Sequence, residues 1–344
     1  DHYLVQEFRA PQGYQASAVE FKPFVIDIND VDSDTPTPEV VEFFNQQVPS
    51  SLSVVKHDAD VAGLIVPGAT FELWRESNGT AGLQIDPTTG DTLVHTCTTS
   101  ADDAGTPADE RVCRRSGLPF GTYYWLETAA PTGYELPQLA DRLQLADANA
   151  VTITRANAGS SFATLVIEDP KKLTDLRVVK LDEDTGLRVG GATFELYLED
   201  NGVAGLQIDD TGLPGPYDQL VGSCSTDPDD SGTPADERVC SLNDLTWGDY
   251  YWLETAAPTG YQLPPLGDRL SDAAAGMVTI EAANAGTTLA VTEISDPQVR
   301  SVLEVLKRDG DTGAVVGGAT FELWRESNGA AGLQVGAGGD SLVD

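Results

Sequence analysis

A lysine, a glutamate and an aspartate recur in the same order along this chain, each within a run of residues typical of a β-strand. The two complete sets are Lys56, Glu127 and Asp169, and Lys180, Glu254 and Asp296. In an apolar site the pKa of an amine falls and that of a carboxyl rises, so a neutral amine can lie beside a neutral acid. The amine could then attack the side-chain carbonyl of the aspartate while the glutamic acid donates a hydrogen bond to it. The product is an amide, which leaves no charge to bury.

The two-residue period of a strand indicates that these groups point inward. The residues two and four positions earlier, on the same face, are apolar: Leu52 and Val54 for Lys56, Tyr123 and Trp125 for Glu127, and Leu165 and Ile167 for Asp169. The second set follows nearly the same pattern. A buried salt-bridge cluster is the alternative, but desolvation of three such groups offsets or exceeds their attraction.

Two further sets are partial. Residues 1–48 contain Glu7 and Asn45 without a matching lysine, whereas 299–344 contain Lys307 without an acid or an acceptor. We expect the missing partners before residue 1 and beyond residue 344, on the same chain. The alternative is head-to-tail completion by a neighbouring chain through Lys307–Asn45 cross-links.

A competing acceptor exists within the complete repeats. Asn157 and its counterpart Asn284 share the sequence Ala-Asn-Ala-Gly. That sequence is more simply explained as the turn of a hairpin.

The elements that must position these groups are also repeated. The sequence YYWLETAAPTGY occurs at 123–134 and again at 250–261, with a looser copy at 3–14. Short alternating runs separated by Gly, Pro, Asp and Asn predict strands and turns, without a convincing helical period. The class is therefore all-β, with a two-sheet sandwich in each repeat. We expect the C-terminal part of one repeat at 1–48, complete repeats at 49–171 and 172–298, and the N-terminal part of another at 299–344.

The four cysteines form two copies of a C-x15-C pattern, 127 positions apart (224 − 97). Two local disulfides, Cys97–Cys113 and Cys224–Cys240, are the economical interpretation and indicate an oxidising compartment. A zinc site would need close cysteine pairs or histidine partners, and the second repeat has no histidine. We expect no metal and no cofactor.

The formal net charge is −35 and the pI is about 4.1. Nucleic acids and anionic lipids both require basic patches, so neither is expected as a partner. No apolar run approaches the roughly 20 residues of a membrane-spanning helix. The composition suits a folded protein with a solvated extracellular surface.

Read in order, the motifs VxKxD, TGxxxGGATFEL, YYWLETAAPxGY and (V/I)xxDP resemble the Cna B-type, SpaA-like (prealbumin-like) domains of Gram-positive surface adhesins and pilins. That resemblance covers nearly the whole chain and implies tandem prealbumin-like (Ig-like) β-sandwiches that form intramolecular Lys–Asp or Lys–Asn isopeptide bonds. It implies a catalytic role for Glu127, Glu254 and Glu7. The C-x15-C loops depart from the family pattern, as does the change of acceptor from Asn45 to aspartate.

The resulting expectation is a structural stalk or fibre shaft at the cell surface or cell wall, in contact with neighbouring repeats. An adhesive module that binds a host protein or glycan through the cysteine-clipped loops is the alternative. An enzyme acting on an external substrate is not expected, because the perturbed groups are consumed in a single internal reaction.

Overall fold

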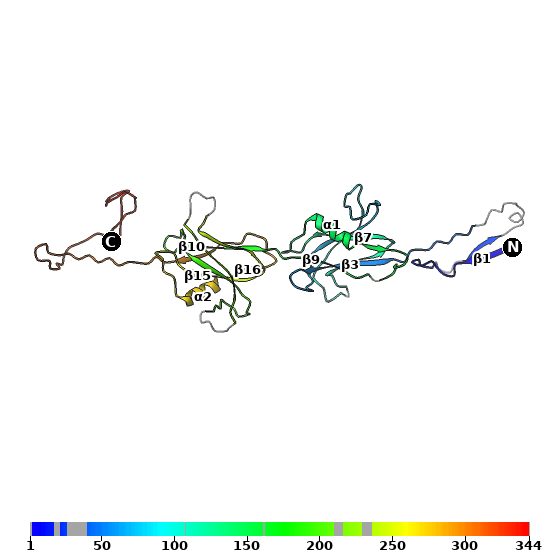
Figure 1. Ribbon diagram of the computed structural model, residues 1–344, viewed down its shortest axis with the longest axis horizontal. Coiled ribbons are helices and arrows are strands. Elements are labelled where there is room, and N and C mark those ends of the chain that lie inside the picture. Colours follow the sequence, from blue (N-terminus) through cyan, green and yellow to red (C-terminus); the bar gives the residue numbers. More distant parts are fainter. Residues whose placement is uncertain are drawn as a thin grey trace. The chain divides into compact units, whose positions relative to one another are not determined.

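The computed structural model describes residues 2–16, 21–25, 40–106, 108–160, 162–209, 216–228 and 236–343, to which every structural statement below refers. The chain forms two compact units, Asp1–Pro297 and Gln298–Asp344. Strands predominate and two β-sandwiches account for most of the first unit (Figure 1). The all-β class and the sandwich architecture are therefore confirmed.

The first sandwich is built from two facing sheets. Its strands are β3 (Ser50–Asp58), β4 (Thr70–Arg75), β5 (Thr92–Thr98), β6 (Val112–Leu118), β7 (Gly121–Ala129), β8 (Val151–Ile153) and β9 (Leu165–Asp169). One sheet has the order β6-β3-β9 and the other β5-β4-β7-β8. All pairs are antiparallel except β3 with β9, the first and last strands, which run parallel. The chain thus enters and leaves the sandwich on neighbouring strands.

The core between these sheets contains the residues that the alternation pattern placed inside. Leu52 and Val54 of β3 pack with Phe71 of β4 and with Tyr123 and Trp125 of β7. Phe71 and Trp125 meet edge to face, with ring centroids 6.5 Å apart. Burial of such large apolar side chains is the main force that holds the two sheets together.

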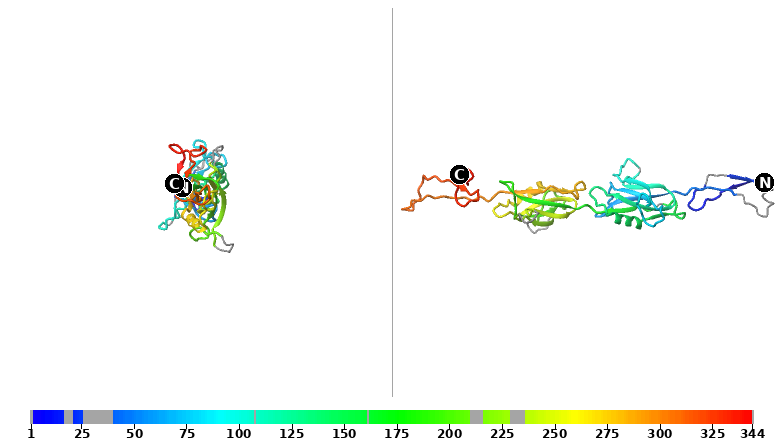
Figure 2. Two further views of the ribbon diagram at one scale, coloured as in Figure 1. Left: turned by 90° about the vertical axis from the view of Figure 1, so that its left-hand side faces the viewer. Right: turned by 90° about the horizontal axis from the view of Figure 1, so that it is seen from above.

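A short helix, α1 (Leu139–Ala148), covers the outer face of β7 and was not anticipated from the sequence. Tyr124 and Leu126 of β7 form a second buried cluster beneath it, with Ala146 of the helix. Figure 2, in the view from above, shows the helix on the outside of its sandwich. Strand β7 is consequently buried on both faces, which explains its unbroken run of aromatic and aliphatic residues.

The second sandwich repeats this plan. Its elements are β10 (Thr174–Asp182), β11 (Arg188–Val189), β12 (Thr193–Leu198), β13 (Gln219–Ser225), β14 (Val239–Leu245), β15 (Gly248–Ala256), α2 (Leu266–Ala275), β16 (Val278–Ile280) and β17 (Thr292–Asp296). The sheets are β11-β10-β14, with β17 also on β10, and β13-β12-β15-β16. Strands β10 and β17 again run parallel.

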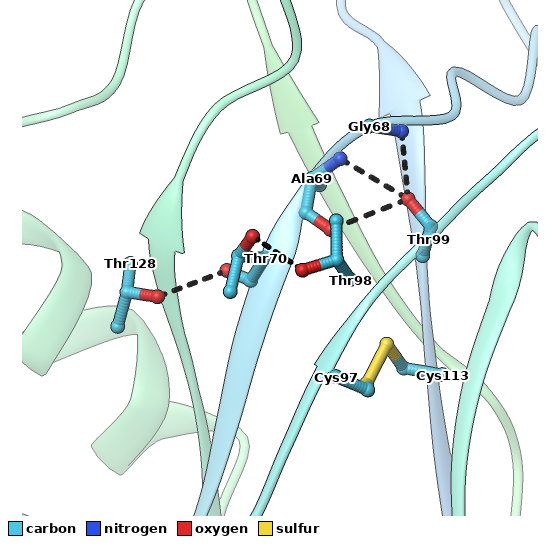
Figure 3. Close-up of a disulfide and its surroundings, with 8 residues drawn as sticks. All are labelled: Gly68, Ala69, Thr70, Cys97, Thr98, Thr99, Cys113 and Thr128. Atoms are coloured by element: carbon cyan, nitrogen blue, oxygen red, sulfur yellow. Dashed lines mark hydrogen bonds between the residues drawn. A yellow bond between two sulfur atoms is a disulfide. The ribbon is translucent and has the colours of Figure 1, made fainter.

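Both predicted disulfides are present, Cys97–Cys113 and Cys224–Cys240. Cys97 lies on β5 and Cys113 on β6, which belong to different sheets, so the bond joins the two layers (Figure 3). Just after Cys97, the Thr99 hydroxyl accepts hydrogen bonds from the backbone N–H groups of Gly68 and Ala69. In the chain-entropy model, closing a loop of this length stabilises the fold by about 3 kcal/mol.

Outside the sandwiches, the described residues contain little regular structure. Strands β1 (His2–Gln6) and β2 (Phe21–Val25) form an antiparallel pair near the N-terminus. In the second unit, β18 (Trp324–Arg325) pairs with β19 (Ser341–Leu342). Neither α1 nor α2, each of ten residues, is long and apolar enough to cross a membrane, nor is any other helix in the described ranges.

Candidate functional site

The structure brings Lys56, Glu127 and Asp169 together inside the first sandwich. Lys56 Nζ lies 2.8 Å from Glu127 Oε2 and 2.5 Å from Asp169 Oδ1. The lysine and the aspartate are fully buried and the glutamate is 2% exposed. Since charged residues are almost never buried without partners, this group is a candidate site rather than ordinary core.

Strand register explains how these side chains meet. Strand β3 carries Lys56, and its parallel neighbour β9 aligns Asp58 with Asp169, two positions beyond the lysine. Side chains two positions apart share a face, so Lys56 and Asp169 project from adjacent strands into the space between the sheets. Glu127 reaches the same space from β7 in the opposite sheet.

The second sandwich contains the same arrangement. Lys180 Nζ lies 2.7 Å from Glu254 Oε2 and 2.6 Å from Asp296 Oδ1. All three side chains are again buried. The corresponding distances in the two triads agree within 0.1 Å, so the arrangement is the same in both sandwiches.

Burial controls the protonation of the site. Removal from water raises the pKa of both Glu127 and Glu254 to about 7, and the hydrogen bond from the lysine only partly opposes this effect. Burial likewise raises the pKa of Asp169 above its usual value. These carboxyls therefore hold protons more readily than exposed ones do.

As a salt-bridge cluster, the triad leaves several of its carboxyl oxygens without hydrogen bonds. Glu127 Oε1 and both oxygens of Asp169 are buried without a hydrogen-bond partner in the described structure, and the same atoms of the second triad share this condition. Asp169 Oδ1 contacts Lys56 Nζ as an ion pair at 2.5 Å. Buried polar atoms without partners are costly, and conversion of the amine and one carboxyl to an amide would remove the charges.

The repeated Ala-Pro-x-Gly-Tyr segment holds the end of the lysine strand. The hydroxyl of Tyr134 donates a hydrogen bond of 2.8 Å to Asp58 Oδ2, two residues beyond Lys56. Tyr261 bonds Asp182 in the same way at 2.7 Å. Gly133 has a φ of +82°, which L side chains rarely adopt. The turn thus anchors the tyrosine against the triad strand.

The two partial sets, near the N-terminus and near the C-terminus, differ in structure. Asn45 Nδ2 donates a hydrogen bond of 2.7 Å to Glu7 Oε1, so this acid and its acceptor are adjacent. Lys307, in contrast, lies exposed in the second unit. The expected inward face of its segment is exposed too, including Leu303 and Val305.

The competing acceptor Asn157 is engaged in a turn. Its side chain accepts a hydrogen bond from the backbone N–H of Thr154 and donates one to the carbonyl of Thr152. Asn284 makes the equivalent contacts. These hydrogen bonds agree with the turn interpretation.

Sequence reasoning missed Arg142 and Arg269, which lie on the two helices. Arg142 Nη1 donates to the backbone carbonyl of Glu127 at 2.5 Å, and Arg269 does the same for Glu254. The signal was available, because an Asp-Arg-Leu triplet recurs at the 127-residue spacing (269 − 142). It was not recognised because no helix was expected there.

Within the described part of the chain, no group of three or more His, Cys, Asp or Glu side chains could hold a metal ion. Part of the second cysteine-clipped loop, 229–235, lies outside the described residues. The first such loop is largely exposed and holds its own contacts, including those of Arg111 with Asp109.

Comparison with known families gives one match. A model for a SpaA prealbumin-like fold domain matches residues 50–158 and 174–266, which together make up more than half of the chain. The matched segments contain the lysine and glutamate of each triad and end before the acceptors Asp169 and Asp296. No curated protein matches the chain.

Several solved structures are similar over much of the chain. The Bacillus anthracis TIE protein is 18% identical with a TM-score of 0.40, over 86% of this chain and 41% of its own length. A streptococcal ancillary pilin is 16% identical with a TM-score of 0.27, over 87% of this chain and 76% of its own. The shaft pilin SpaA of Lactobacillus rhamnosus GG is 14% identical with a TM-score of 0.25, over 74% and 99%. These likenesses are too weak to carry an argument about function.

Proposed function

This chain belongs to the family of SpaA prealbumin-like fold domains, and from that premise we propose that it is part of a structural stalk or fibre shaft. In this proposal, residues 49–171 and 172–298 are the two complete repeats. Each is closed by an amide between its first and last strands, Lys56 to Asp169 and Lys180 to Asp296. The observation that carries the proposal is the presence of two buried triads with matching distances.

The reaction is a condensation within each repeat. The neutral amine of Lys56 attacks Cγ of the protonated Asp169, while Glu127 donates a hydrogen bond to the carbonyl oxygen and relays protons. The C–N bond forms as the C–O bond breaks, and one water leaves. No oxidant or cofactor is required, and each site reacts once.

Strand topology gives this amide a mechanical role. Because β3 and β9 are parallel neighbours and the first and last strands of the sandwich, tension along the chain enters through one and leaves through the other. An amide between them would carry that load directly. The intervening residues, including the Cys97–Cys113 disulfide, would then be protected from extension.

The proposal places the protein outside the cell, at a cell surface or cell wall, where disulfides persist. Its partners would be neighbouring repeats of the same fibre. Adhesion to a host protein or glycan through the cysteine-clipped loops remains the second candidate, and it would be favoured if loop substitutions abolished surface binding while leaving the cross-links intact.

The intact mass of the folded chain tests the cross-links. We expect a mass lower than the sequence mass by two waters, from two amides, and by four hydrogens, from the two disulfides. Reduction should restore only the hydrogens. A fully folded chain that has lost no water would contradict the amides and leave only the disulfides.

The pH dependence of bond formation is a second test. The reactive state needs Glu127 and Asp169 protonated, and burial raises the pKa of both, that of Glu127 to about 7. The rate should therefore fall with rising pH once either carboxyl loses its proton, no later than about pH 7, by about tenfold per unit for each proton lost. The measurement is the appearance of cross-linked peptides with time, after chain purified in the unfolded state before any amide has formed is allowed to fold at a series of pH values.

Asp169→Asn is the matched control for that test. An amide acceptor requires no proton of its own. The reactive state of this variant therefore needs only one proton, on Glu127, with Lys56 neutral. The decline should move to higher pH, and ammonia should leave instead of water. Identical pH profiles for the aspartate and the asparagine acceptor would contradict the proposed proton requirement.

A further inference from the structure

Each triad lies beneath a helix whose single arginine reaches the strand of the glutamate. Arg142 of α1 donates through Nε to the carbonyl of Pro137 at 2.8 Å and through Nη1 to the carbonyl of Glu127 at 2.5 Å. Arg269 of α2 bonds the carbonyls of Pro264 and Glu254 at 2.9 and 2.5 Å. The planar guanidinium presents its donors in a fixed fork, so each arginine fixes the loop after the strand relative to the glutamate's own peptide group.

The same arginines line cavities beside the triads. A cavity of about 220 Å³ is bounded by Arg142 together with Glu127 and Asp169, and one of about 330 Å³ by Arg269 together with Glu254 and Asp296. The charged and titratable residues that line this cavity with Arg142 are Glu127 from β7, Glu168 and Asp169 from β9, and Asp141 from its own helix. Lys56 of β3 contacts both triad carboxyls. Among the described residues that line this cavity, Arg142 is the one cation, and the others are carboxylates and apolar side chains.

The contacts of the two arginines differ from those of a surface ion pair. Among the described residues, neither arginine forms a salt bridge with a carboxylate, and the hydrogen bonds from both go to backbone carbonyls. The same two acceptors recur in both repeats, so each arginine is bonded to the peptide of the triad acid.

We propose that Arg142 and Arg269 are positioning residues for amide formation, which hold the glutamate against the lysine and the acceptor aspartate. The inference rests on the proposed function. A misplacement of about 1 Å can lower the rate of an intramolecular reaction about a hundredfold. Loss of the fork should therefore slow the bond in the repeat where it occurs and leave the other repeat unaffected.

The charge of the arginine adds an effect that a purely structural role lacks. The nearby guanidinium lowers the pKa of Glu127 and of Asp169, against the larger effect of burial. Without that charge the two carboxyls should keep their protons to higher pH. The decline of the rate with pH should then move upward, even though the maximal rate is lower.

The experiment compares Arg142→Gln with Arg142→Lys in the whole chain. Each chain is purified in the unfolded state before any amide has formed and is then allowed to fold at a series of pH values, and cross-linked peptides from the two repeats are quantified separately with time. Arg142→Gln should form the Lys56–Asp169 bond at least tenfold more slowly, with its decline shifted to higher pH. Arg142→Lys keeps the charge but not the fork, so its rate should fall without the shift.

Two internal controls make the result decisive. The Lys180–Asp296 bond should form at the wild-type rate in both variants, and Arg114→Gln, which removes an exposed arginine on β6, should leave both bonds unchanged.

A wild-type rate and pH profile in Arg142→Gln would overturn the inference while the proposed function stands. If neither repeat of the wild-type chain forms an amide, the proposed function itself fails. Should Arg142→Gln not fold, Arg142→Lys decides through its maximal rate, and a wild-type rate there overturns the inference.

Discussion

Replacement of Glu127 by alanine is expected to leave Lys56 and Asp169 unjoined, because no acid then donates a hydrogen bond to the aspartate carbonyl. The amide closes a segment of 113 positions (169 − 56). In the chain-entropy model, loss of a cross-link over a loop of that length lowers the free energy of unfolding by about 4–5 kcal/mol. The lysine, fully buried, also loses its hydrogen bond to Glu127 Oε2, which adds to the destabilisation.

Thermal unfolding and peptide mapping of the whole chain measure this effect. The transition of the 49–171 repeat should fall by roughly 15–25 °C for a domain of this size, whereas the 172–298 repeat keeps its bond through Glu254. Glu72→Ala removes a half-buried glutamate on β4 that contacts Trp74 and should leave both cross-links in place. Recovery of the Lys56–Asp169 peptide from the Glu127→Ala chain would show that another group supplies the acid.

The second large effect is mechanical. Under tension, an amide between β3 and β9 should prevent the residues between Lys56 and Asp169 from extending. Lys56→Met removes the amine at similar side-chain volume, so the first repeat should then unfold in a single additional step. With the disulfide intact, 97 residues contribute (113 − 16), which corresponds to roughly 32–35 nm.

Single-molecule stretching with and without reductant checks both cross-links at once. Reduction should lengthen the step of the Lys56→Met chain by the 16 positions between Cys97 and Cys113, roughly 5–6 nm. The wild-type chain should not respond to reductant, because its disulfide lies inside the segment that the amide bypasses. A wild-type repeat that extends by the full 32–35 nm or so under force would rule out the load-bearing amide.

Much of the site was predictable because its signals are local. Alternation along the strands indicated that Lys56, Glu127 and Asp169 face inward, and all three are buried. The C-x15-C spacing correctly predicted both disulfides. Each conclusion depends on residues a few positions apart or on comparison of one repeat with the next.

Helix α1 was not predictable on the same basis. The segment 139–148 has only a weak apolar face, and its one buried residue is Ala146. Its place is set by the outer face of β7, where Tyr124 and Leu126 need cover. Tertiary packing rather than periodicity therefore decides that this segment is helical. Arg142 could be assigned to the site only once the helix was placed against β7.

The sequence by itself determined the repeats, the inward direction of the triad side chains and the cysteine pairs, since repetition and strand alternation are properties of neighbouring residues. Only the tertiary structure decided which groups meet. Lys56 and Asp169 are adjacent because β3 and β9 pair in parallel, and Glu127 joins them because its sheet packs face to face with theirs. Lys307 occupies a segment with the same local pattern yet is exposed, because no facing sheet packs against that segment among the described residues.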